Sequence, residues 1–177
     1  GYPPSGVPTD PDDYGQEQSV DDLRELLDSL GVEKAHIGGL SMGGNVALNY
    51  GIKYPKRSAS GIVAATGSGS VDPAMFRSTM ANSAATLELN GMETPDQIRG
   101  SMNVQLLRKD PKGWEEFAQN RAEHSGLGTA LTMRGVQGKR PTIFELESKL
   151  RSFEPPALIM VGDEDDACLE PGLFMLS

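Results

Sequence analysis

The chain has 177 residues with 25 acidic and 16 basic side chains, and its formal net charge is -9 at pH 7. This acidic balance argues against nucleic acid or an anionic membrane surface as a main partner, and no apolar run approaches the roughly 20 residues that cross a bilayer. The single cysteine, Cys168, cannot form an intramolecular disulfide, which favours a reducing, cytoplasmic setting. The length suits one domain with its own core, or one domain with an insertion.

The first predicted element is an amphipathic helix that follows a loop over residues 1–18. Ser19, with Asp22 three positions later, forms an N-terminal capping pattern. One apolar stripe, closed by Gly31, consists of Val20, Leu23, Leu26, Leu27 and Leu30. A stripe of this kind indicates packing against a core.

A glycine-rich turn, Gly-Leu-Ser-Met-Gly at residues 39–43, stands between an apolar run at 35–38 and a helix-like run at 45–50. A serine on a tight strand-to-helix turn needs glycines two positions before and after it, because side chains there would meet the neighbouring strand and helix. The next residue, Gly44, is expected to add slack. The spacing predicts a nucleophile elbow at Ser41, with an ordinary packing turn as the alternative.

Such an elbow needs a base and an oxyanion donor, because an unassisted serine hydroxyl is a weak nucleophile. The helix that begins after Ser41 leaves its first N–H groups without intrahelical partners, so the N–H of Met42 is the predicted donor. His36, five residues before Ser41, is expected near the far end of the strand in a structural role. His124 ends a polar helical stretch, where a cationic ring is favoured, and its alternative role is that of a substitute base.

Two further strands are predicted, both buried and parallel, over 61–65 and 157–161. Between them, residues from about 68 to 140 are expected to be helical, followed by a helix over 143–150. The methionines of this helical part either line a pliable apolar pocket or fill irregular cores. They are Met75, Met80, Met92, Met102 and Met133.

Four carboxylates at residues 163–166 follow the last predicted strand, where ligand sites form in open α/β sheets. A solvated acidic loop and a divalent-metal site are the alternatives, and the metal site lacks a spaced set of further oxygen ligands. Cys168 and Glu170 either border a pocket mouth or belong to a loop that leads into a helix at Pro171.

These features together resemble the α/β-hydrolase family with a helical cap. The resemblance is carried by residues 36–44, by the cap-sized helical part, and by the Gly-x-x-Asp ending in which Asp165 follows Gly162. It implies an α/β fold of three layers (α/β/α) with a mostly parallel sheet and an inserted helical cap. By the same resemblance Ser41 is the nucleophile, Met42 an oxyanion donor, and Asp165 the acid that orients a histidine.

The family pattern divides the chain into an incomplete core at 1–67 and 141–177 and a cap at 68–140. In the family the histidine lies downstream of the acid, whereas the sequence ends at Ser177, and the early strands with the second oxyanion donor lie upstream of Gly1. The chain is therefore expected to be partial and nearly inactive alone. Its two outer strands would lack neighbours, which predicts marginal stability or a homo-oligomer formed through exposed sheet edges.

The predicted partner is a small-molecule carbonyl substrate, such as an ester or a lactone, with no cofactor and no metal. A non-catalytic ligand-binding or interaction protein on the same scaffold is the alternative, because a fold does not fix a function. Within the enzyme class, carbon–carbon bond hydrolases, haloperoxidase-like enzymes and lyases also stay open. A nucleophilic serine in place of aspartate argues against dehalogenase and epoxide-hydrolase chemistry.

Overall fold

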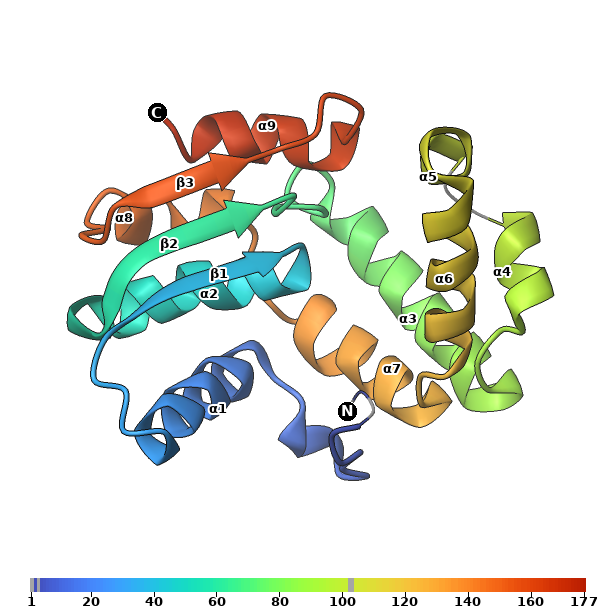
Figure 1. Cartoon of the computed structure of the whole chain (residues 1–177). Coiled ribbons are helices and arrows are strands. Elements are labelled where there is room, and N and C mark those ends of the chain that lie inside the picture. The colour runs from blue at the N-terminus through green and yellow to red at the C-terminus, as the bar shows by residue number, and fades with distance from the viewer. Residues whose placement is uncertain (1, 3, 102–103) are drawn as a thin grey trace.

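The computed structural model describes residues 2, 4–101 and 104–177 (Figure 1). Strands β1 (Ala35–Leu40), β2 (Ser58–Ala64) and β3 (Ala157–Met160) form a parallel sheet in the order β1-β2-β3, which confirms the predicted α/β class. The helices and short helical turns are η1 (Pro11–Asp13), α1 (Gln16–Ser29), α2 (Met42–Lys53), η2 (Pro55–Arg57), α3 (Pro73–Asn90), α4 (Pro95–Ser101), α5 (Val104–Lys109), α6 (Pro111–Ala122), α7 (Gly126–Thr132), η3 (Met133–Gln137), η4 (Phe144–Leu146), α8 (Glu147–Leu150) and α9 (Asp166–Phe174).

The three strands end at the same level of the sheet. Leu40 pairs with Ala64, and Ala64 pairs with Met160, so the last residues of the strands form one row. In Figure 1 all three arrows point toward the same side, where α3 to α7 lie beyond the strand ends. The loops that leave the strands therefore emerge together along one edge.

One face of the sheet carries the core. Val63 of β2 packs with Leu48 of α2 and with Ile143 and Leu146, and Phe174 of α9 packs against the same cluster. A second cluster joins α1 to the same face and contains Val20, Ile37, Ala47 and Tyr50. The apolar stripe predicted for the first helix contributes Val20, Leu23 and Leu27 to this packing, whereas Leu26 and Leu30 are exposed.

The opposite face of the sheet is open in the described part of the chain. Leu40, Ile62, Leu158 and Met160 are 69%, 40%, 54% and 50% exposed, and the strand register places them on one side. The prediction that the two later strands are buried is therefore wrong for this face. Their apolar runs suit a sheet covered on both faces, but the described helices pack only on the other side.

Among the described strands, β1 and β3 are the edge strands of the sheet, as the sequence predicts. Association of copies through these edges stays a prediction. The bounds of β2 differ from those expected, because the strand begins at Ser58, three residues earlier than predicted.

The start of α1 differs from the predicted capping pattern. The helix begins at Gln16 with Gly15 as its N-cap, and Ser19 lies inside the first turns, where its hydroxyl donates to the Gly15 carbonyl at 2.9 Å. Ser and Thr side chains compete with the helix backbone for such bonds, so the same residue type serves as a cap or as an interior donor. The Ser19–Asp22 pattern therefore predicts the helix correctly. The predicted start is wrong, because the helix begins at Gln16.

In the helical part between β2 and η4, the described methionines take both expected places, since Met80, Met92 and Met133 also line hollows between helices. Met92 and Met133 pack against the core of Ala84, Leu87 and Ala130. Met75 is 65% exposed on α3, and Met102 lies outside the described residues. Among the described helices, none combines the length and the apolar character that a bilayer crossing requires.

Candidate active site

The turn between β1 and α2 holds Ser41 in an uncommon backbone conformation. Its φ is 53° and its ψ is -111°, values that cost a non-glycine residue on the order of 1–3 kcal/mol unless the surroundings hold them. The backbone N–H of Ser41 donates to the Ala64 carbonyl at 2.8 Å, which fixes the turn to the end of β2. The residue is exposed at the tip of the turn.

Glycines on both sides of Ser41 meet different degrees of crowding. A Cβ on Gly39 would overlap the backbone of Gly43, as the elbow pattern predicts. A Cβ on Gly43, however, would meet nothing within 4 Å, so the expected clash two positions after the serine is wrong. The crowded position is Gly44, where a Cβ would overlap Thr66 and approach the Gly39 carbonyl to 3.0 Å.

Two polar side chains that the sequence reasoning missed hold the Ser41 carbonyl. Asn45 donates to it through its backbone N–H at 3.1 Å and through Nδ2 at 3.2 Å. The Thr66 hydroxyl lies 3.3 Å from the same carbonyl and 2.9 Å from the Ala64 carbonyl. Both side chains are buried, at 2% and 1% exposure. Only the polar character of two residues beside apolar runs hinted at this role.

The N-terminus of α2 faces the turn. The bond from the Asn45 N–H to the Ser41 carbonyl is the first of the helix, so the N–H groups of Met42, Gly43 and Gly44 precede it and have no partner of this type. The N-terminal end of a helix also carries partial positive charge. Met42 is thus the first helical residue after Ser41, where the sequence expects the oxyanion donor.

Asp165 lies on the loop after β3, at the N-cap of α9. Its N–H donates to the Gly162 carbonyl at 3.1 Å, and its own carbonyl accepts from the Cys168 N–H at 2.9 Å. It is half-buried, whereas the other acids at 163, 164 and 166 are exposed. The helix begins at Asp166 and contains Pro171, which corrects the expected helix start at Pro171.

Ser41 follows β1 and Asp165 lies on the loop after β3, so the two residues lie on either side of β2. Because neighbouring strands lie about 4.8 Å apart, β1 and β3 are separated by about 10 Å across β2. Both residues belong to loops at the carboxyl ends of the strands. This edge is where open parallel sheets bind their ligands.

Glu164, next to Asp165, joins the acidic loop to the helical part. Its carboxylate lies 3.0 Å from Arg108 and 2.9 Å from Lys109, both in α5. Hydrogen bonding to Lys109 lowers the pKa of Glu164 below its ordinary value. In the described ranges, no group of three or more His, Cys, Asp or Glu side chains is arranged to hold a metal ion.

Cys168 is buried beneath this loop at 3% exposure. Burial raises the pKa of its thiol from 9.0 to about 11, and the negative charge of Asp165 and a hydrogen bond to its side chain act in the same direction. The thiol is therefore protonated at neutral pH. Because the folded-state pKa is the higher one, this contribution to stability is present below pH 9 and is lost as the pH rises toward 11.

We expect Cys168 to resist alkylation while the protein is folded. A pKa raised by two units lowers the thiolate fraction at pH 8 about 100-fold, and burial slows the reaction further. Mass spectrometry after iodoacetamide treatment, with and without denaturing urea, measures both rates. Equal rates in the two conditions would contradict the buried, protonated thiol.

Both histidines have packing contacts. The Nδ1 atom of His36 lies 2.7 Å from the Ser60 hydroxyl on the open face of the sheet, which is a structural contact with a neighbouring strand. The ring of His124 follows α6 and stands edge-on to Tyr2, with the ring centroids 4.8 Å apart. The contacts described for His124 give no support to its role as a substitute base.

Comparison with known proteins identifies relatives of the chain. The alpha/beta hydrolase fold family model matches residues 1–167. A 2-hydroxy-6-oxononadienedioate/2-hydroxy-6-oxononatrienedioate hydrolase of Paraburkholderia phymatum is 41% identical over 147 residues, which are 81% of this chain and 50% of that protein. Another of the same name from Pseudomonas putida is 28% identical over 164 residues, 88% of this chain and 55% of its own length.

Solved structures of hydrolases have the same fold as this chain. A hydrolase from Pseudomonas aeruginosa PA01 superposes with a TM-score of 0.80 at 26% identity, over 99% of this chain and 63% of that one. An enol-lactonase from Burkholderia xenovorans LB400 gives the same TM-score at 20% identity, over 98% and 64%. The chain thus spans between half and two thirds of the length of these proteins. From its sequence and its fold, it belongs to the alpha/beta hydrolase family.

Proposed function

We propose that the intact protein is a serine hydrolase in which Ser41 attacks the carbonyl carbon of an ester, a lactone or a related compound. The observation that carries the proposal is the conformation of Ser41, exposed at a strand-to-helix turn and held there at positive φ by Ala64, Asn45 and Thr66. A turn of this kind presents a hydroxyl free of its own backbone. Non-glycine residues keep such conformations where the surroundings enforce them.

In the proposed reaction, a histidine takes the proton as the Ser41 oxygen bonds to the carbonyl carbon. The N–H of Met42 and the helix N-terminus stabilise the oxyanion that forms. When the intermediate collapses, the bond to the leaving group breaks, the histidine returns the proton, and water then hydrolyses the acyl enzyme. Asp165 orients the imidazole, which we assign to a segment beyond residue 177, because His36 and His124 have packing contacts.

The substrate class follows from the relatives only in outline. Their names indicate a lactone for one and oxo-dienedioates for others, and all of these contain a carbonyl carbon that a serine can attack. We assign residues 68–140 to a cap that covers the site, because α3 to α7 lie beyond the carboxyl ends of the strands (Figure 1). The single cysteine favours a cytoplasmic location for this enzyme.

A fluorophosphonate probe applied to the intact protein tests the nucleophile. We expect one adduct, on the tryptic peptide of residues 35–53, and its loss in Ser41→Ala. Ser60→Ala is the matched control, because Ser60 also lies at hydrogen-bond distance from a histidine and should leave labelling unchanged. Labelling that persists in Ser41→Ala, or an adduct on Ser60, would end the assignment.

A further inference from the structure

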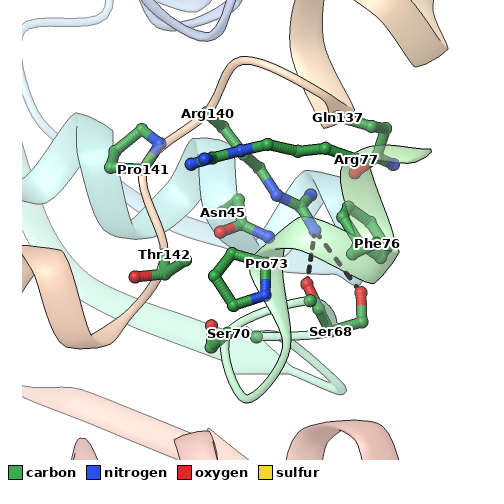
Figure 2. A pocket seen from close by; sticks show the side chains of 12 residues that line it. Asn45, Ser68, Ser70, Pro73, Phe76, Arg77, Gln137, Arg140, Pro141 and Thr142 are labelled. Atoms are coloured by element: carbon green, nitrogen blue, oxygen red, sulfur yellow. Dashed lines mark hydrogen bonds between the residues drawn. The ribbon is translucent and has the colours of Figure 1, made fainter. Parts of the chain in front are cut away.

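A small cavity lies where the chain leaves the sheet after β2 and where it returns before η4 (Figure 2). Its volume is about 10 Å³, which is close to the minimum that holds one water-sized particle. Asn45, which also holds the Ser41 carbonyl, forms part of the wall. The cavity therefore shares Asn45 with the turn that contains Ser41.

Arg140 is a charged residue of this cavity and is only 8% exposed. One end of its guanidinium, Nη2, donates to the Ser68 carbonyl at 3.1 Å and lies 3.4 Å from the Ser68 hydroxyl. Its Cζ stands 5.5 Å from the centre of the Phe76 ring. The other end, Nη1, is buried and has no hydrogen-bond partner in the described structure.

Among the described residues that line the cavity, no carboxylate stands opposite the charge of Arg140. None of the described residues that line the cavity is acidic, and burial lowers the pKa of Arg140 because desolvation disfavours its cation. Arg77 lines the same cavity, and Figure 2 shows its side chain extended across it. A buried cation without a counter-charge is strongly unfavourable, so the site favours an anion.

Neighbouring polar groups are compatible with an anion. The Ser70 hydroxyl accepts from the Ile143 N–H at 3.0 Å, which leaves its own hydrogen available as a donor. The Gln137 Oε1 atom is also buried without a partner, and a rotation of this amide by half a turn presents its NH₂ group in place of the oxygen. Donors from both connecting segments thus line the same cavity as Arg140.

We propose that this cavity is an anion site, in which Nη1 of Arg140 binds a small monoanion, either the carboxylate of a substrate or a free halide or formate. The free-anion form is independent of the hydrolase function, whereas the carboxylate form rests on it. In both forms the anion joins the segment that contains Ser68 to the segment that contains Arg140. Occupancy therefore stabilises the place where the helical part meets the sheet.

Bromide tests the site directly in the wild-type protein. Crystals of the intact protein grown with sodium bromide should show an anomalous peak within hydrogen-bond distance of Nη1 of Arg140. In solution, the unfolding midpoint should rise with bromide, chloride or formate relative to gluconate at equal ionic strength. The rise should reach roughly 5 °C at about 100 times Kd.

Matched variants identify the cause of this rise. It should vanish in Arg140→Gln and persist in Arg134→Gln, because Arg134 is a surface residue paired with Glu88 at 2.8 Å. Arg140→Lys, which keeps the charge, should retain part of it if the glutamine variant fails to fold. Ser41→Ala should retain the whole effect, so the anion site and the proposed nucleophile are tested separately.

Substrate pairs then distinguish the two sources of the anion. An activated ester with a free carboxylate and its neutral methyl ester are compared. If the substrate supplies the anion, kcat/KM for the first should exceed that for the second about tenfold through KM, with the preference lost in Arg140→Gln and with formate competing. A midpoint rise without such a preference assigns the site to a free anion. Equal midpoints in all salts, no bromide peak and no preference would show a site for water only and overturn the proposal.

Discussion

Asp165→Asn should lower kcat/KM of the intact protein for ester hydrolysis by about 10⁴-fold. The amide carries no negative charge to stabilise the imidazolium, and it holds the imidazole in the wrong tautomer. The fold should survive, because the bonds that Asp165 makes to Gly162 and Cys168 through its backbone do not involve the carboxylate, and an amide oxygen still accepts a hydrogen bond from the Cys168 thiol. Initial rates over a range of ester concentrations, with circular dichroism as a check on folding, give the result.

Neighbouring acids provide the controls for this experiment. Asp163→Asn and Asp166→Asn remove one charge each from the same loop, and both residues are exposed. We expect each to change kcat/KM less than about threefold, because exposed charges are screened by solvent. If Asp165→Asn keeps a tenth of the activity, or if Asp163→Asn loses as much, the acid is assigned to the wrong residue.

Gly39→Ala should lower the free energy of unfolding by about 3 kcal/mol or more. The added Cβ overlaps the backbone of Gly43, and a backbone cannot rotate away as a side chain can. Relief would require the turn to open, which removes Ser41 from its position. Urea unfolding measures the loss, and fluorophosphonate labelling should fall with it.

Gly43→Ala is the matched substitution, with the same added atom four residues away. Its Cβ meets nothing within 4 Å, and alanine favours a helix over glycine by about 1 kcal/mol. The variant should therefore be as stable as the parent, or more stable by up to about that amount. Similar losses in Gly39→Ala and Gly43→Ala would show that crowding at the elbow does not set the glycine requirement.

Local sequence patterns predict the turn and its surroundings because short-range sterics determine them. The run from 35 to 50 encodes a strand, a crowded glycine turn and a helix within a few residues, and the structure contains all three. The detail within the turn is less accessible, since the crowding at Gly44 comes from Thr66, which lies far along the chain. Gly15 likewise caps α1 without a side chain that a pattern could detect.

Features that depend on contacts between distant parts of the chain were not predicted, because local sequence patterns do not contain those contacts. Arg140 meets Ser68 across 72 residues, and no local pattern distinguishes it from an ordinary surface arginine. The sequence also did not predict the open face of the sheet. Apolar residues in a strand, such as Ile62 and Leu158, predict burial, whereas the structure exposes both. Which face is covered depends on the helices that the chain supplies, and the strand sequence alone does not contain that information.

The common level at which the strands end, with Leu40, Ala64 and Met160 in one row, has an evolutionary consequence. Each loop beyond that row is encoded by its own stretch of sequence and begins at a strand end that the sheet holds in place. Mutations can therefore exchange one loop at a time while the scaffold persists. Such modularity lets one architecture serve proteins of different names, such as the enol-lactonase whose structure superposes on this chain.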